Sequence, residues 1–228
     1  MKKGDTRREQ ILMAAEGLFY RKGFEQTSIQ DILDALRLSK GGLYHHFTSK
    51  LALLEAICDM RADESFEASR AAFERHAGRP VEALNALLDS GSVFRADKLD
   101  YVGLLLRVAY REDGALMREK IKQTAIARTR PLIDQVIIEG AAQKLFILPR
   151  PVLAGEMILR LCNQFTDEVA LILSGGGDEA EQITAILEKL EMYRYAVERL
   201  LGAPFGSVLL YDMHNLAAVC RGLAQRKG

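Results

Sequence analysis

The hydrophobic residues of this chain recur at helical spacing along its whole length. Between residues 11 and 19 they follow the i, i+1, i+4, i+7, i+8 pattern of one buried helix face: Ile11, Leu12, Ala15, Leu18 and Phe19. Ile29, Ile32, Leu33 and Leu36 repeat the same periodicity. No segment of useful length alternates apolar and polar residues, as a half-buried strand would. The pattern therefore predicts an all-α fold.

Capping and breaking residues divide this pattern into separate helices. Arg21 and Lys22 followed by Gly23 are typical of a helix C-terminus. Hydroxyl side chains then stand where the next three helices begin: Thr27 or Ser28, Ser39, and Ser49. The fourth helix can run to His76, and further helices are predicted near 80–97, 99–112, 114–143, 150–173, 179–201 and 207–226. The run Gly175–Gly177 lacks a preceding strand and a following Lys-Ser/Thr, so we interpret it as an interhelical linker.

Composition narrows the classes of protein that this chain can belong to. Its 228 residues, 49% of them hydrophobic, suffice for one large domain or two coupled ones. Cys58, Cys162 and Cys220 lie far apart in apolar stretches and predict buried, reduced thiols, and no Cys/His cluster has zinc-ligand spacing. The longest apolar run, Tyr101–Leu106, is far short of the ~18 residues of a membrane span. We expect a soluble cytoplasmic protein with no metal, no cofactor and no membrane partner.

Charge is balanced overall but not locally. Lys+Arg and Asp+Glu are 31 each, whereas residues 1–50 carry nine Lys and Arg against six Asp and Glu, a net charge of +3. Residues 37–50 hold three cations and two histidines and no acidic residue. A local basic face on a neutral protein is compatible with DNA binding, because the field at the contact surface is the one that matters.

Three helices within about forty residues, the second and third separated by a short turn, predict a helix-turn-helix whose third helix can enter a major groove. If Leu43 and Phe47 are buried, the exposed face of that helix carries five other residues: Lys40, Gly41, Gly42, Tyr44 and His45. Two successive glycines are poor helix formers. They are useful where another backbone approaches closely, as a groove wall does, although a frayed helix start would also explain them.

Two stretches of the sequence resemble the DNA-binding signature of the TetR family. The first runs from Lys22-Gly23-Phe24 through Thr27-Ser28-Ile29 to Asp31-Ile32, and the second runs from Ser39 to Lys50, within a resemblance over about residues 5–57. It implies a three-helix DNA-binding domain at 1–50 and a larger helical domain at 51–228 for ligand binding and dimerisation. The implied function is a DNA-binding transcriptional regulator, a repressor released from operator DNA by a small-molecule effector.

The resemblance also assigns roles to individual residues. Thr27 or Ser28 would hold a DNA phosphate at a helix N-terminus. Groove-lining roles fall to Lys40, Gly41, Gly42 and His45, and phosphate contacts to Tyr44 and Lys50. A half-buried core aromatic is the alternative for Tyr44, and we expect His46 to be structural. Arg37 stands in the turn, where the family usually has Ala-Gly-Val or similar. A positive φ there would cost on the order of 1 kcal/mol, and its charge would add a phosphate contact.

For the larger domain the resemblance implies a ligand cavity within residues 80–173 and nearby. Its candidate lining residues are Phe66, Phe73, Phe94, Tyr101, Leu105, Val108, Met117, Ile121, Asn163 and Phe165. Many of these are equally compatible with an ordinary core, and the sequence does not identify the effector.

A homodimer through residues 150–201 is the expected assembly. The helix before Gly202 carries a long apolar face that includes Leu190 and Val197, and the preceding helix offers Leu153, Met157 and Phe165. Two such helices can meet their symmetry mates as a four-helix bundle, although packing within the monomer is the alternative. In the tail, the spacing of five residues predicts an extra amphipathic helix: Leu209, Met213, Leu216, Cys220 and Leu223.

Two other classes of protein fit the sequence less well. An enzyme is disfavoured, because the chain has no nucleophile motif, metal-ligand cluster or phosphate loop, and its four histidines are scattered. A helical interaction module without DNA binding is the other alternative. Tyr44, Lys50 and the basic 37–50 stretch favour the DNA-binding protein instead.

Overall fold

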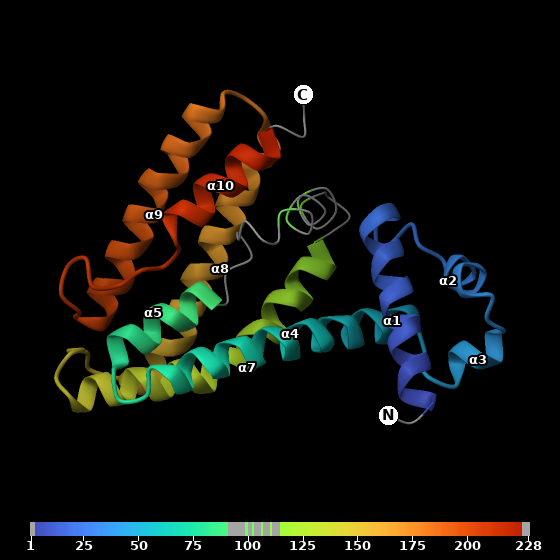
Figure 1. The fold of residues 1–228 in the computed structure, drawn as a ribbon, viewed down its shortest axis with the longest axis horizontal. Coiled ribbons are helices and arrows are strands. Elements are labelled where there is room, and N and C mark those ends of the chain that lie inside the picture. The colour runs from blue at the N-terminus through green and yellow to red at the C-terminus, as the bar shows by residue number, and fades with distance from the viewer. Residues whose placement is uncertain are drawn as a thin grey trace. The chain divides into compact units, whose positions relative to one another are not determined.

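The computed structural model describes residues 3–90 and 115–224, together with Leu99, Val102, Leu106 and Tyr110. Every regular element within these residues is a helix (Figure 1), which confirms the all-α prediction. The helices are α1 (Lys3–Lys22), α2 (Ile29–Leu36), α3 (Lys40–Tyr44), α4 (Lys50–Arg75), α5 (Pro80–Ser90), α7 (Ala115–Ala142), α8 (Pro151–Gly175), α9 (Glu179–Leu201) and α10 (Met213–Ala224). Within the described part of the chain, no helix is both long and apolar enough to cross a membrane.

The chain divides into two compact units. The first comprises Met1–Ala62 and Leu104–Thr124, and the second comprises Asp63–Gly103 and Ala125–Gly228. The boundaries fall inside α4 and α7, so neither unit is one continuous stretch of chain. The functional division at residue 50 stays a prediction.

The first unit is built around the apolar face that the sequence predicts for α1. The side chains of that face are buried with partners from α2, α3 and α4: Ile11, Leu12, Ala15, Leu18, Phe19, Ile32, Leu33, Leu43, Phe47, Leu53 and Leu54. An ion pair adds a polar link between α1 and α4, because Arg61 donates from Nε and Nη2 to the two carboxylate oxygens of the buried Glu16, at 2.7 and 2.5 Å. Packing and this pair together fix α1 against the helices that follow it.

In the second unit α8 and α9 form an antiparallel pair, joined by the predicted glycine linker and crossed by α10 (Figure 1). Asp178 caps α9, accepting a hydrogen bond from the Glu181 N–H at 3.1 Å. The pair is also joined through Glu168 on α8, which accepts from Lys189 at 2.7 Å and from Tyr193 at 2.6 Å. The Lys189 ammonium is the main reason why the pKa of Glu168 lies below its ordinary value.

The last helix is shorter than its predicted range of 207–226, since it begins at Met213. Asp212 caps it, its Oδ1 accepting from the N–H groups of His214 at 2.7 Å and Asn215 at 3.0 Å. The preceding residues are held by side chains instead: Val208 N–H donates to Glu198 and Leu209 N–H to Asn85. The predicted apolar stripe is therefore only half buried, with Leu209 and Met213 exposed. The helix predicted at 99–112 lies outside the described residues, apart from four single positions. The last residues of the helix predicted at 80–97 also lie outside them.

Candidate nucleic-acid interface

The helix-turn-helix begins with a reciprocal cap on α2. The Ser28 hydroxyl accepts from the Asp31 N–H at 3.1 Å, and the Asp31 carboxylate accepts from the Ser28 N–H at 2.8 Å. Asp31 also pairs with Lys22 at the end of α1, at 2.5 Å. No role was predicted for Asp31, although a serine followed three residues later by an acidic residue is the signature of such a cap. The cap and the ion pair together fix where α2 starts.

This arrangement lowers the pKa of Asp31 from 3.8 to about 2, because Lys22 first, and then Ser28, donate hydrogen bonds to its charged form. A pKa that is lower in the folded state stabilises that state above the ordinary pKa, and the contribution disappears as pH falls through the folded value. We expect Asp31→Asn to reduce the urea midpoint at about pH 6, and the difference from wild type to shrink between about pH 4 and pH 2. A difference that stays constant with pH would show that the Asp31 charge is not its source.

The turn between α2 and α3 depends on an unusual backbone conformation at Arg37. This residue adopts φ 49° and ψ 46°, in the left-handed region, and its N–H points to the carbonyls of Asp34 and Leu33. The N–H of Leu38 also donates to the Leu33 carbonyl, at 2.9 Å. The positive φ that the sequence left conditional is therefore confirmed, at a strain of about 1 kcal/mol. The Arg37 side chain is exposed.

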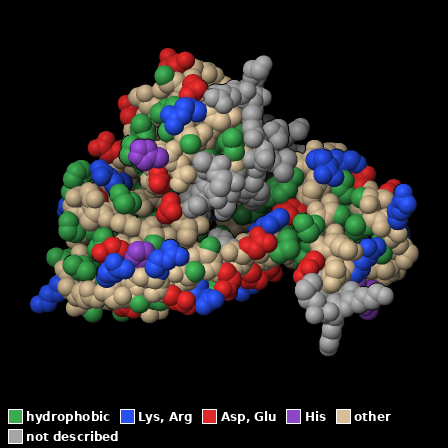
Figure 2. Space-filling model, in the orientation of Figure 1, with side chains coloured by type: hydrophobic (Ala, Val, Ile, Leu, Met, Phe, Trp, Pro, Cys, Tyr) green, Lys and Arg blue, Asp and Glu red, His purple; other side chains and the backbone are tan. Residues whose placement is uncertain are grey.

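Helix α3 presents the predicted face outward. Ser39 caps it through a bond from the Gly42 N–H at 3.2 Å, and Leu43 anchors it in the core. Lys40, Tyr44 and His45 are exposed, Tyr44 at 45% of its surface, so the Tyr44 ring is accessible to solvent. Figure 2 shows several Lys and Arg side chains over the part formed by α1, α2 and α3. This short helix, anchored by Leu43, thus exposes the Lys40 ammonium and the Tyr44 hydroxyl to solvent.

The two glycines of α3 have different surroundings. A Cβ on Gly41 would meet nothing within 4 Å, whereas a Cβ on Gly42 would lie 2.9 Å from Cδ1 of Leu38. Packing inside the protein therefore gives a reason for Gly42, since a side chain there would displace Leu38. It gives no reason for Gly41, and the two explanations from the sequence, a frayed helix start and the close approach of an external partner, both stay open.

Thr27 does not have the role that the sequence offered it as an alternative to Ser28. Its side chain is completely buried, and its hydroxyl donates to the Gly23 carbonyl at 2.7 Å. Thr27 thereby closes the end of α1 from inside the domain and is not accessible to a phosphate. Ser28 is exposed and keeps the predicted position at the α2 N-terminus.

Lys50 is held inside the protein, which the sequence did not predict. Its ammonium donates to the carbonyls of Phe24 at 2.8 Å and Glu25 at 3.2 Å, and lies 4.5 Å from the centre of the Phe24 ring. Two of its three N–H donors are therefore used by the α1–α2 turn. Another cation, Arg8, lies 5.2 Å from the centre of the Phe47 ring, at the end of the stretch that carries α3. Lys50 thus contacts the segment before α2, and Arg8 contacts the segment after α3.

Among the residues that the structure describes, the predicted ligand residues do not gather around one cavity. Phe66 lines a cleft of about 550 Å³ between α4 and α7, together with Asp63, Glu67, Ala127, Arg128, Pro131 and Leu132. Phe165 is fully buried, with its ring 4.8 Å from that of Tyr211 and 5.5 Å from that of Tyr193, so it belongs to the core that joins α8 to α9. Phe73, Ile121 and Asn163 are half-buried. The remaining candidates lie outside the described residues or, for Met117, have no described side chain: Phe94, Tyr101, Leu105, Val108 and Met117.

The apolar face predicted for dimerisation also divides into two. Leu190 and Val197 are buried within the chain, because they face α8 and the segment that precedes α10. The large apolar residues that remain exposed on these helices are Val152, Leu153, Met157 and Leu171 on α8 and Met192 and Tyr195 on α9. Any interface formed by α8 and α9 therefore uses this second set.

Comparison with known proteins gives consistent matches. Residues 11–57 match the family model described as bacterial regulatory proteins, tetR family. The chain is 35% identical to the HTH-type transcriptional regulator YerO of Bacillus subtilis, over 45% of this chain and 36% of YerO. It is 25% identical to the HTH-type transcriptional repressor KstR2 of Mycolicibacterium smegmatis, over 78% of this chain and 85% of that protein.

A solved structure extends the similarity along most of the chain. The TetR family regulator PfmR of Thermus thermophilus superimposes with a TM-score of 0.52 and 26% identity, over 85% of this chain and 98% of PfmR. The sequence matches at 30% identity or more are shorter: the chain spans only 36% of YerO and 39% of TtgR of Pseudomonas putida. The helix-turn-helix is thus the part that is most clearly shared.

Proposed function

We propose that the chain is a regulator of the TetR family, which binds double-stranded operator DNA as a homodimer and represses transcription until a small-molecule effector releases it. One observation carries the proposal. Lys40, Gly41, Tyr44 and His45 are exposed on a five-residue helix that is anchored by Leu43 and follows a left-handed turn. Such a helix can approach base edges in a major groove, while Ser28, Arg37 and Tyr44 contact phosphates on either side.

The proposal is tested by selecting bound duplexes from a random DNA library with the full chain. We expect a site made of two inverted half-sites, since a two-fold symmetric dimer reads a palindrome. The double variant Lys40→Ala/His45→Ala, which changes only exposed side chains, should lose the enriched sequence while remaining folded. Failure of the wild-type protein to enrich any sequence would contradict sequence-specific DNA binding.

The two lysines of this region should respond differently to removal. Lys50→Ala deprives two backbone carbonyls of a charged donor, so we expect a loss of about 1.5–3 kcal/mol in the free energy of unfolding. Lys40→Ala removes an exposed side chain, so stability should change by less than about 0.5 kcal/mol. It should instead relax preference at one base pair of each half-site, by about 1–3 kcal/mol if it contacts a guanine.

Urea unfolding and fluorescence anisotropy on operator variants separate these two effects. The control is Lys144→Ala, which removes a lysine from the end of α7, in the other unit, and should change DNA binding little. If Lys50→Ala left stability unchanged and altered only DNA affinity, the positioning role of Lys50 would be wrong.

Gly41 offers a change with opposite effects on folding and on binding. Alanine is the better helix former, and no atom within 4 Å opposes its Cβ, so Gly41→Ala should stabilise the protein by up to about 1 kcal/mol. The added methyl group should weaken operator binding if the DNA approaches this backbone closely. The measurements are thermal unfolding and anisotropy, and equal or tighter operator binding by the variant would remove Gly41 from the groove.

For the effector we propose the cleft at Phe66. It is lined from both α4 and α7, and α4 is the helix that follows directly on the helix-turn-helix. A ligand that weakens operator binding tenfold must itself be weakened tenfold by operator, about 1.4 kcal/mol of coupling. Calorimetric titration of a candidate effector with and without operator DNA measures this reciprocity directly.

A further inference from the structure

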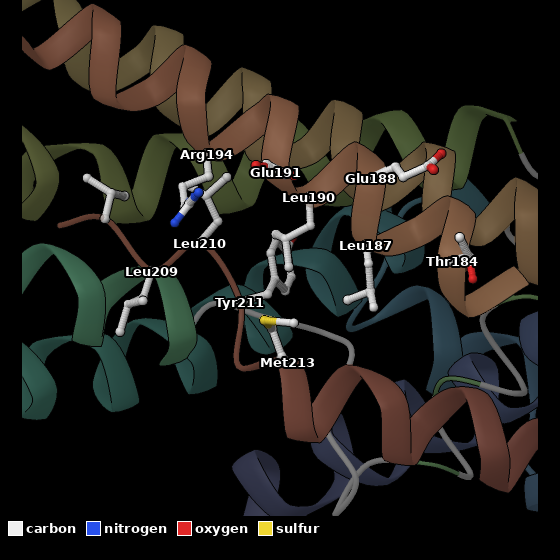
Figure 3. A pocket seen from close by; sticks show the side chains of 11 residues that line it. Thr184, Leu187, Glu188, Leu190, Glu191, Arg194, Leu209, Leu210, Tyr211 and Met213 are labelled. Atoms are coloured by element: carbon white, nitrogen blue, oxygen red, sulfur yellow. The ribbon is translucent and has the colours of Figure 1, made fainter. Parts of the chain in front are cut away.

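A second cavity lies between α9 and the extended segment that leads into α10, and its lining residues are not among the predicted ligand residues. Its volume is about 400 Å³, within the range of small-molecule sites. Figure 3 shows its side chains: Thr184, Leu187, Glu188, Leu190, Glu191 and Arg194 on α9, facing Leu209, Leu210, Tyr211 and Met213. Most of the lining is apolar, and the charged groups stand on α9.

Hydrogen bonds hold the wall opposite α9 in place. The Val208 N–H donates to Oε1 of the buried Glu198 at 3.1 Å, and Asn85 bonds both the Leu209 N–H, at 2.9 Å, and the Ser207 carbonyl, at 3.0 Å. The Tyr211 hydroxyl is 2.7 Å from that of Thr166 on α8. The wall is thus tied to three different helices, so the cavity is formed before any ligand enters it.

Arg194 is the side chain in this cavity that most needs a partner. It is half-buried, and its guanidinium lies 4.8 Å from the centre of the Phe205 ring. A contact with a ring takes up no hydrogen-bond acceptor, and a guanidinium can pair with a planar anion through two parallel N–H groups. No hydrogen bond or ion pair joins Arg194 to any other residue that the structure describes. Glu188 and Glu191 are exposed, so water solvates their carboxylates.

We propose that this cavity binds a small apolar carboxylate. The carboxylate pairs with Arg194 at one end, and the hydrocarbon part contacts Leu187, Tyr211 and Met213. At roughly 30 Å³ per water-sized unit, the cavity holds about a dozen non-hydrogen atoms, the size of decanoate. Glu188 lies six positions from Arg194 along α9, about 9 Å, so its charge is distant from the bound anion.

The proposed dimer and this cavity both use α9. Met192 follows Leu187 by five positions, which places it about 140° further round the helix at 100° per residue. Tyr195 lies about 80° from Leu187, between Thr184 and Glu188, so the rim of the cavity adjoins the exposed apolar set of α8 and α9. Ligand binding here is independent of DNA binding, so the experiment below remains informative whatever the outcome of the operator selection.

The test uses a single-tryptophan reporter. The chain has no tryptophan, and Met213 is exposed at the cavity, so the emission of Met213→Trp reports occupancy. We expect saturable binding of decanoate, at one molecule per chain by calorimetry on the wild type, and much weaker binding of decanol and decyltrimethylammonium. Arg194→Gln should weaken decanoate binding about 10- to 100-fold, as expected for a lost charged hydrogen-bond pair. Glu191→Gln should strengthen it slightly, because it removes a negative charge one turn from Arg194.

Matched controls distinguish this site from general adsorption to apolar surface. Arg199→Gln removes an exposed arginine from the same helix, five positions away, and should leave decanoate binding unchanged. Arg194→Lys keeps the charge without the planar edge and should retain part of the affinity. The proposal is overturned if decanoate fails to saturate, if Arg194→Gln and Arg199→Gln behave alike while folded by circular dichroism, or if the cationic detergent binds as well as decanoate.

Discussion

Replacement of Met157 and Met192 by glutamate is expected to convert the protein into monomers and to lower its operator affinity by about 100- to 10,000-fold. Both methionines are exposed, at 52% and 64% of their surface, so the substitutions disturb no packing within the chain. In a two-fold symmetric interface each glutamate appears twice, and the buried charges have no partners. The loss of affinity follows because each monomer holds a single half-site, without the effective concentration that the second one provides.

Sedimentation equilibrium and anisotropy on the selected operator measure the two effects. Wild type should sediment at twice the 25.4 kDa of one chain, and the variant at that mass. Met213→Glu is the matched control, because Met213 is similarly exposed but lies at the start of α10, outside the exposed apolar set of α8 and α9. A dimer that persists in the double variant would exclude the exposed faces of α8 and α9 as the interface. Leu190 and Val197 are unsuitable for this test, since their burial within the chain makes unfolding the expected result.

The second large effect is expected at Gly202, where α9 ends. This residue has φ 60°, and a Cβ on it would lie 2.1 Å from the carbonyl oxygen of Ile147. A neighbouring hydrogen bond, from the Ile147 N–H to the Leu201 carbonyl at 2.8 Å, holds the backbone between α7 and α8 in place. Gly202→Ala should therefore lower the free energy of unfolding by two contributions. Left-handed backbone strain contributes about 1–2 kcal/mol, and overpacking against Ile147 contributes about 1–3 kcal/mol.

Gly78→Ala provides the matched control, because Gly78 has φ 76° and a Cβ on it would meet nothing within 4 Å. Gly78→Ala should lower the free energy of unfolding only by the backbone strain, about 1–2 kcal/mol. Urea unfolding of both variants separates conformational strain from steric overlap. Equal losses in the two variants would show that the contact between Gly202 and the α7–α8 connection relaxes at little cost.

The sequence by itself determined the features that depend on residues close together in the chain. Helical periodicity and caps identified all nine helices of the described residues, most within a few positions of their ends. The same local information predicted the helix-turn-helix and the outward face of α3, because burial of Leu43 leaves only one side of so short a helix exposed. For Arg37 it gave only a condition, that a positive φ would be strained, and the structure then showed that φ to be positive.

Only the tertiary structure decided which of several equivalent side chains faces solvent. Thr27 and Ser28 are adjacent hydroxyls that both suit a helix N-terminus, and the end of α1 buries one of them. Lys50 resembles any surface lysine in sequence, until the carbonyls of Phe24 and Glu25, some 25 positions earlier, take two of its donors. Likewise, α9 is apolar on more than one side. Contact with α8 and with the segment before α10 determines that Leu190 is core, that Met192 is free for a second copy and that Arg194 lines a cavity. Long-range packing sets these choices, because burial depends on neighbours that helical periodicity does not specify.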